Sequence, residues 1–160
     1  MSFQGIAPIR FGSVSAVTAT RGPNDPEVGT RTTEDGRSYV YVYNAGNSTA
    51  QVGMGMVLAT TATNHSCTIT SVTSADLCIG VVKHANITTG AYGWLLTRGM
   101  GNVQMLASSG SVSDRGLLEL GAAGLFAPVS NTTGNKAYAV GQALADIATG
   151  ASGNAYIAIF

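Results

Sequence analysis

The chain has 160 residues, the length of one domain, and only 10% of them are charged, against roughly 25% in an ordinary soluble domain. Eight basic and eight acidic residues give a formal net charge of zero, which excludes the surplus of cations that nucleic-acid binding needs. No stretch approaches the ~20 apolar residues of a membrane helix, and MSFQGIAPIRF lacks the charged start and apolar run of a signal peptide, so we expect a protein made in a cytoplasm.

Residues 1–36 predict an extended N-terminal arm. Their segment GPNDPEVG has two prolines and two glycines, which indicates turns and extended chain. The apolar residues before this segment follow no helical period. We therefore interpret the arm as a segment that becomes ordered by lying on another surface. The alternative is a partly disordered terminus followed by one edge strand.

Residues 37–160 predict a β domain. The run RSYVYVYN alternates with a period of two, which puts Tyr39, Tyr41 and Tyr43 on one face of a strand. Short apolar runs follow at close spacing, most of them separated by clusters of Gly, Asn, Ser or Thr, and none is an amphipathic run of helix length. This pattern predicts an all-β fold, namely a compact antiparallel β-barrel or β-sandwich.

The stretch GAYGWLLTRGMGNV, residues 90–103, predicts a β-hairpin whose turn is RGMGN. Alternation places Tyr92, Trp94 and Leu96 on one face. A phosphate-binding loop is excluded, because its glycines would have to lead into a helix, whereas NVQML has the pattern of a strand. We expect Trp94 to anchor the core. The alternative is a sugar-stacking platform formed by Trp94 and the row of tyrosines.

A weak internal similarity joins residues 52–59, VGMGMVLA, to residues 140–147, VGQALADI. A Val-Gly pair that leads into a strand is typical of a bend or bulge. Because the chain contains 21 glycines, two such pairs do not indicate a repeat.

The two cysteines and two histidines raise the question of a metal site. His65 and Cys67 are two residues apart and Cys78 and His84 are six apart, so each pair shares a strand face, and four such donors could bind zinc. The C-x2-4-C and H-x3-5-H spacings of structural zinc sites are absent. We therefore predict no metal, no cofactor and two buried free thiols, with a Cys67–Cys78 disulfide as the alternative.

The candidates for catalysis are few. Glu119 and Asp146 are the only acidic residues inside apolar runs. A buried carboxylate pair could act as general acid and base, but a charge that protects a sheet edge is the better interpretation. The chain has no G-x-S-x-G, H-E-x-x-H or Ser/His/Asp spacing. We predict no catalytic residues and no enzymatic activity.

The residues from Cys78 onward resemble a known family. CIGVVKHANITTGAYGWLLTRGMGNVQM is followed by RGLLELGAAGLFAPV and AVGQALADIATGASGNAYIAIF. Their order of strands and glycine turns is similar to that of the small capsid decoration proteins, or cement proteins, of tailed bacteriophages. The resemblance covers residues 37–160 and rests on the pattern of glycines and strand starts. The low charge agrees with it, because a chain with few charges has little protection against association.

The resemblance implies a non-enzymatic virion protein on the capsid surface. Such proteins bind the outer surface of the major capsid protein lattice, often as homotrimers, and strengthen the head against the pressure of its DNA. In several of them an N-terminal arm reaches over neighbouring subunits. The implied partners are thus the major capsid protein and further copies of the chain, without direct contact to nucleic acid or a membrane. The alternative function is the host-surface glycan-binding head of a fibre or spike. The residues expected at the capsid or neighbour interface are Phe3, Ile6, Ile9, Phe11, Arg21 and Arg31.

Overall fold

The computed structural model describes residues 14, 16–59, 65–69, 78–129 and 139–159. This part of the chain forms ten strands and one short 3₁₀ turn, with no α-helix, which confirms the predicted all-β fold. The strand order is β1-β2-β4-β3-β5-β6-β10-β9-β7-β8, with an additional pairing between β2 and β6. The elements are β1 (Arg31–Glu34), β2 (Arg37–Asn44), β3 (Gly55–Leu58), β4 (Ser66–Thr68), β5 (Cys78–Val82), β6 (Tyr92–Gln104), β7 (Leu117–Leu120), η1 (Ala122–Gly124), β8 (Phe126–Pro128), β9 (Gly141–Ala143) and β10 (Ser152–Ala158).

The pairing of β2 with β6 closes a first barrel, whose five strands follow the order β2-β4-β3-β5-β6. All of its pairings are antiparallel except that of β2 with β4. Val40 and Val42 of β2 and Leu95 of β6 are almost fully buried in one hydrophobic cluster inside it. The alternation that puts the tyrosines of RSYVYVYN on one face therefore puts its valines in the barrel.

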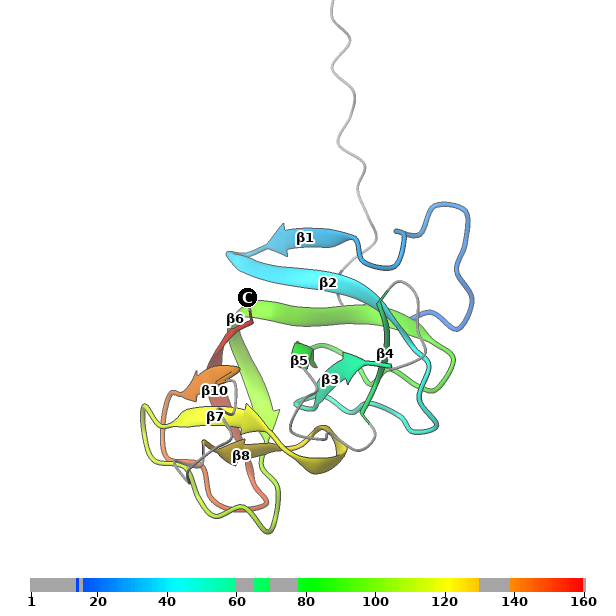
Figure 1. The fold of residues 1–160 in the computed structure, drawn as a ribbon. Coiled ribbons are helices and arrows are strands. Elements are labelled where there is room, and N and C mark those ends of the chain that lie inside the picture. The colour runs from blue at the N-terminus through cyan, green and yellow to red at the C-terminus, as the bar shows by residue number, and fades with distance from the viewer. Residues whose placement is uncertain (1–13, 15, 60–64, 70–77, 130–138, 160) are drawn as a thin grey trace, which may run out of the picture.

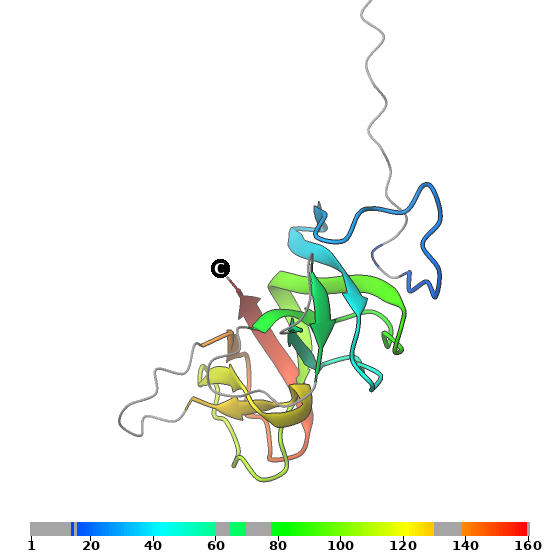
Figure 2. The ribbon, with the colours of Figure 1, turned by 45° about the vertical axis from the view of Figure 1, so that its right-hand side comes forward.

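The remaining strands form a second barrel on the other side of β6. The second half of β6 pairs with β10, and the order continues through β9 and β7 to β8. A parallel bridge between Met105 and Phe126 then returns from β8 to the end of β6. The two barrels lie side by side and are joined through β6 (Figures 1 and 2). Leu118, Phe126 and Ile157 are fully buried in a hydrophobic cluster that also contains residues of the first barrel.

Strand β6 is continuous from Tyr92 to Gln104, so the hairpin predicted at RGMGN is wrong. Its first half pairs with β2 and its second half with β10, with a register shift opposite Ser38 where one half meets the other. Gly99 has a φ of 119°, and a Cβ added at Gly101 would lie 2.7 Å from a methyl carbon of Leu96. These glycines therefore bend the strand and let it pack closely, instead of reversing it.

The two barrels have the same topology. In each, the first strand pairs parallel with the third and antiparallel with the fifth, the second pairs with the third and fourth, and the fourth pairs with the fifth. The strands of the two barrels thus correspond one to one. In chain order, the first barrel consists of β2, β3, β4, β5 and the first half of β6, and the second consists of the second half of β6, β7, β8, β9 and β10. The fifth strand of the first barrel continues directly as the first strand of the second.

The correspondence extends to single hydrogen bonds. Ala50 and Ile87 exchange two backbone bonds of 3.0 and 2.8 Å, and Val112 and Ile147 exchange two of the same lengths. A sequence signature accompanies them, because residues 85–93, ANITTGAYG, and residues 145–153, ADIATGASG, are identical at six of nine positions. The chain therefore contains two repeated units, and equivalent residues of this signature lie 60 positions apart.

This repeat differs from the similarity seen between residues 52–59 and 140–147. Gly53 donates its N–H to the carbonyl oxygen of Val82, and the corresponding bond in the second barrel runs from Arg115 to Ala143. The first Val-Gly pair therefore corresponds to Asp114 and Arg115 of the second barrel, not to the second Val-Gly pair. The chain does contain a repeat, which was not predicted from the sequence. The two Val-Gly pairs are not equivalent positions in it.

Candidate functional site

A row of aromatic side chains lies on the face of β2 and β6 that points away from the interior of the first barrel. Tyr41 and Trp94 are cross-strand partners with ring centroids 5.0 Å apart, and Tyr43 and Tyr92 are partners 4.9 Å apart. Tyr39, Tyr41 and Trp94 are 2%, 3% and 4% exposed. The predicted faces and the core position of Trp94 are confirmed. Because a sugar stacks on an open ring face, these three rings form no sugar-stacking platform.

The N-terminal segment covers part of this aromatic row. Thr18 exchanges backbone hydrogen bonds of 3.0 and 2.8 Å with Tyr92, and its hydroxyl lies 3.4 Å from that of Tyr41. Val14 is buried in the same hydrophobic cluster as Trp94. Thr30 accepts the backbone N–H of Tyr41 at 2.8 Å. Part of the predicted arm therefore lies on this chain's own barrel.

Strand β1 also belongs to the predicted arm. It pairs antiparallel with β2, and the turn between them holds Asp35 and Gly36 at positive φ. The predicted boundary between residues 36 and 37 thus falls at this turn. The outer edge of β1 is polar, with Arg31, Thr33 and Glu34 exposed. Charged residues on an edge strand oppose uncontrolled strand pairing.

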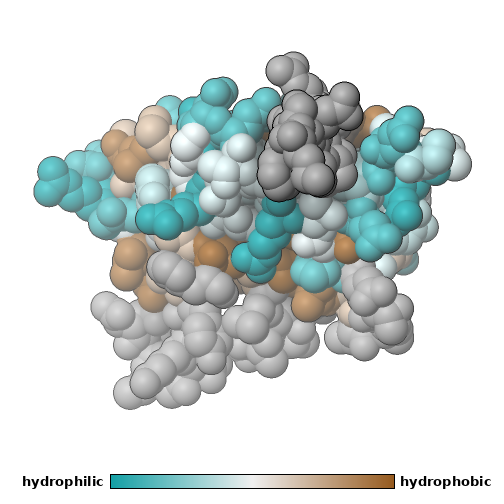
Figure 3. Space-filling view, turned by 90° about the horizontal axis from the view of Figure 1, so that it is seen from above, coloured by the Kyte–Doolittle hydropathy of each residue, from teal (hydrophilic) through white to brown (hydrophobic). Residues whose placement is uncertain are grey.

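The predicted interface residues fall into two groups. Arg21 and Arg31 are both exposed, Arg21 in the segment before β1 and Arg31 on β1 itself. Seen from above in Figure 3, polar residues predominate on the upper face of the molecule, with apolar ones between them. The other four predicted residues, Phe3, Ile6, Ile9 and Phe11, lie outside the described residues.

The four candidate metal donors do not form one group among the described residues. Cys67 is buried in the cluster inside the first barrel, whereas Cys78 is buried in the cluster shared by the two barrels. Both thiols are free, and burial raises the pKa of each to about 12. His84 Nε2 lies 3.2 Å from the hydroxyl of Tyr39, and burial lowers the pKa of its imidazole. The described residues contain no group of three potential metal ligands.

The two acidic residues inside apolar runs have different surroundings. The Asp146 carboxylate accepts the backbone N–H of Asp114 at 2.7 Å, as Asn86 accepts that of Val52 at 2.9 Å in the first barrel. Asp146 is therefore part of the repeated turn structure. Glu119 lies on β7, and its shielded Oε2 has no hydrogen-bond partner among the described residues. Among the described residues, no hydrogen bond joins these two carboxylates.

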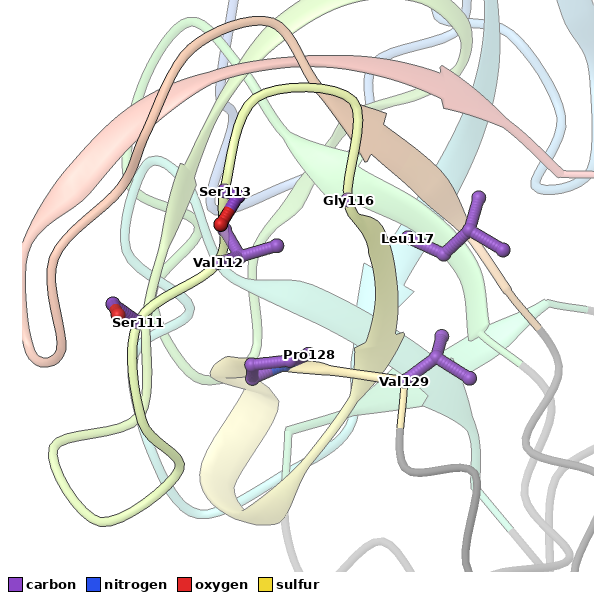
Figure 4. Close-up of a pocket in the computed structure, with 7 residues that line it drawn as sticks. All are labelled: Ser111, Val112, Ser113, Gly116, Leu117, Pro128 and Val129. Atoms are coloured by element: carbon purple, nitrogen blue, oxygen red, sulfur yellow. The ribbon is translucent and has the colours of Figure 1, made fainter.

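Exposed apolar side chains gather on the second barrel. Large apolar side chains are exposed at five described positions, and four of these lie on the outer face of β6, β10, β9 and β7 or at its border. A surface cavity of about 380 Å³ adjoins this face, where β7 begins and β8 ends. Figure 4 shows Leu117 and Val129 on one side of this cavity and Ser111 on the other, with Pro128 between them. The four exposed residues are Met100, Leu117, Leu144 and Tyr156.

These features define an all-β protein built from two barrels that share one strand. No protein-family model matches the chain, and no curated protein matches it. Among solved structures it is similar to the N base of the head fibre gp8.5 of bacteriophage phi29, with a TM-score of 0.51 and 13% sequence identity. The match covers 75% of this chain and 94% of that chain, so the two share a fold. None of the described helical segments is long and apolar enough to cross a membrane.

Proposed function

We propose that this chain is a structural virion protein of a tailed bacteriophage that binds the outer surface of the major capsid lattice and stabilises the head. The observation that carries the proposal is the shared fold with a phage head-fibre base over 94% of that structure. The sequence resemblance to capsid decoration proteins agrees with it. The low charge, which leaves little electrostatic protection against association, supports a protein that works in an assembly.

The attachment we propose runs through the residues before Val14. Since Val14 and Thr18 pack on this chain's own barrel, we place the main attachment in residues 1–13 and keep the exposed Arg21 and Arg31 as further contact residues. An extended segment can add a strand to a neighbouring sheet, where backbone hydrogen bonds give affinity without large side chains. Repeated contacts in a homo-oligomer, for which we propose a trimer, multiply a modest affinity per site.

A truncation tests this proposal. Deleting residues 1–13 keeps Val14, Thr18 and β1, whereas deletion to residue 36 would also remove folded parts of the domain. We expect the shorter truncation to leave the emission and thermal transition of the single tryptophan unchanged but to abolish binding to emptied capsids in a co-sedimentation assay. Truncated protein that still saturates the capsids would contradict the attachment mode. Full-length protein that fails to bind them would contradict the proposed function itself.

The alternative function is the host-surface glycan-binding head of a fibre or spike. Tyr39, Tyr41 and Trp94 are buried, which leaves the half-buried Tyr43 and Tyr92 as the rings of the row that a glycan could reach. Binding to a glycan array, together with failure to bind emptied capsids, would favour this alternative.

A further inference from the structure

A row of exposed side chains crosses four strands of the second barrel. Met100 of β6 pairs with Tyr156 of β10, Tyr156 with Gln142 of β9, and Gln142 with Leu117 of β7. Directly paired residues in antiparallel strands point to the same face, so these four form one continuous row. Met100, Leu117 and Tyr156 are 54%, 50% and 39% exposed.

Through the internal repeat, each residue of this row has an equivalent residue in the first barrel. The equivalent row runs from Tyr39 to Leu96, then to Val81 and Gly55, through the same sequence of strand pairings. This row is buried, with Tyr39 2% exposed and Leu96 and Val81 fully covered. The equivalent surfaces of the two barrels therefore differ, because the row of the first barrel is buried and the row of the second is exposed.

The second barrel is what covers the row of the first. A Cβ added at Gly55 would lie 2.6 Å from Leu120 Cδ1 and 3.0 Å from Phe126 Cζ, so the open end of the second barrel presses on this glycine. A Cβ added at Gly124 in η1 would lie 2.7 Å from the carbonyl oxygen of Gly55 and 3.2 Å from Ile69 Cβ. We call Leu120, Phe126 and η1 the end of the second barrel.

Of this end, the first barrel has one described counterpart that is exposed, namely Leu58; Cys67, the counterpart of Phe126, is fully buried, and the counterpart of η1 lies outside the described residues. Leu58 corresponds to Leu120, because Leu58 pairs with Cys67 and Leu120 with Phe126 at equivalent places in β3–β4 and β7–β8. Leu58 is 46% exposed and is the fifth exposed large apolar side chain of the described residues. On the receiving side, Gly55 and Ile69 correspond to Leu117 and Pro128, and both of these line the cavity of Figure 4.

We propose that a second copy of this chain docks here, with the end of its first barrel, around Leu58, on the exposed row of the second barrel and its cavity at Leu117 and Pro128. The contact places Leu58 of one copy on the second barrel of the next, in the way that Leu120 lies on Gly55 within a chain. It buries Leu58, Met100, Leu117 and Tyr156, and the zero net charge does not oppose it.

The proposed contact is head-to-tail, since it joins two different surfaces. Such a contact closes into a ring when its rotation allows and otherwise extends into a filament. Leu117 carries a side chain where Gly55 has none, so Leu58 packs beside Leu117 and the two copies stand further apart than the two barrels of one chain. The inference does not rest on the proposed capsid function, and its test uses no capsid.

The test compares the molar mass of four full-length proteins by sedimentation equilibrium over a wide range of concentration. Leu58→Glu disables the donor surface and Leu117→Glu the receiving surface, while Thr33→Glu adds the same charge on the exposed edge strand β1 as a control. Removing one buried leucine from an interface weakens it about 10- to 100-fold. We expect the wild type and Thr33→Glu to associate and both leucine variants to sediment as single chains of 16.2 kDa.

Mixing the two leucine variants gives the decisive result. Each retains the surface that the other lacks, so an equimolar mixture restores one contact and yields a dimer that cannot grow. A wild type that stays monomeric overturns the proposal, and so does a mixture that stays monomeric. Association that survives Leu58→Glu but not Leu117→Glu also overturns it, because it indicates a symmetric contact between two rows. Unchanged tryptophan emission shows that each variant is folded, and Leu58→Ser with Leu117→Ser provides a second pair without added charge.

Discussion

Adding one methyl group at Gly153 tests the packing inside the second barrel. A Cβ at this position would lie 2.5 Å from Ile147 Cγ1 and 2.7 Å from its Cδ1. Ile147 is 2% exposed, and its backbone N–H and carbonyl oxygen are both hydrogen-bonded to Val112. The added methyl group therefore fits only if the buried isoleucine side chain shifts. We expect Gly153→Ala to cost about 1–3 kcal/mol, the usual range for overpacking a well-packed core.

The same contact predicts how a second substitution acts. Ile147→Ala alone leaves a cavity and costs about 2–5 kcal/mol. In the double variant the new methyl group occupies part of this cavity, so the total cost is smaller than the sum by at least about 0.5 kcal/mol. Gly93 and Ile87 make the equivalent contact in the first barrel, with 2.7 Å from the added Cβ to Ile87 Cδ1, so Gly93→Ala and Ile87→Ala provide a matched cycle of the same sign.

Urea unfolding, followed by the emission of the single tryptophan and by far-ultraviolet circular dichroism, measures both cycles. Each kcal/mol lowers the thermal midpoint of a chain of this size by roughly 2–4 °C, which gives an independent readout. Additive free energies in either cycle, or a Gly153→Ala variant as stable as the wild type, would refute the packing described here. Opposite signs in the two cycles would refute the equivalence of the two barrels.

Three further predictions concern the two thiols and Asp146. Burial raises the pKa of Cys67 and Cys78 from 9.0 to about 12, so an aromatic disulfide reagent at pH 8 should modify neither thiol in the folded protein and both in urea. The unfolded thiols lose their protons near pH 9, whereas the folded ones keep them. The free energy of unfolding should therefore fall as the pH rises from about 9 towards 12. A rise over this range, measured by urea titration, would contradict the prediction. Asp146→Ala should cost about 0.5–1.5 kcal/mol by removing the acceptor of the Asp114 N–H, whereas Asp146→Asn, which restores the Asn86 arrangement of the first barrel, should recover most of it in the same urea assay. Equal losses in the two variants would show that this acceptor does not matter.

The shared strand links the two barrels in stability as well as in space. The second barrel takes its first strand from the second half of β6, and the first barrel takes its fifth strand from the first half. Residues of both barrels, among them Val81, Leu96, Phe126 and Ile157, are packed in one hydrophobic cluster. Neither barrel can therefore be removed without exposing apolar surface of the other.

Local patterns predicted the positions of many side chains. The period of two in RSYVYVYN placed the three tyrosines of β2 on one face, and Trp94 was expected in the core. Such predictions succeed because alternate residues of a strand point to opposite faces, whatever the strand pairs with. The hairpin at RGMGN failed for the complementary reason. Glycine permits a turn, a bend or a close approach. The neighbours from other strands that decide among these, Arg37 of β2 beside Gly99 and Ile157 of β10 beside Gly101, are supplied by distant parts of the chain.

The candidate surface was not predictable in the same way. The arm residues Arg21 and Arg31 were chosen from the sequence and are exposed, but nothing in the local pattern marked Leu58, Leu117 or Tyr156 as exposed. One signal was available, namely the similarity between ANITTGAYG and ADIATGASG, which indicates two equivalent units. Even this signal does not show which unit covers the other, because that depends on where β6 bends.

The sequence by itself determined that this protein is all-β and which residues of β2 and of the first half of β6 share a face. These properties follow from alternation, glycine turns and low charge, all of which act over a few residues. The tertiary structure alone decided that β6 runs through both barrels, that the chain is a repeat, and that the row of one barrel is buried while its equivalent is exposed. Those properties depend on pairings between residues far apart in the chain, such as Tyr39 with Leu96 and Met100 with Tyr156, which no local pattern specifies.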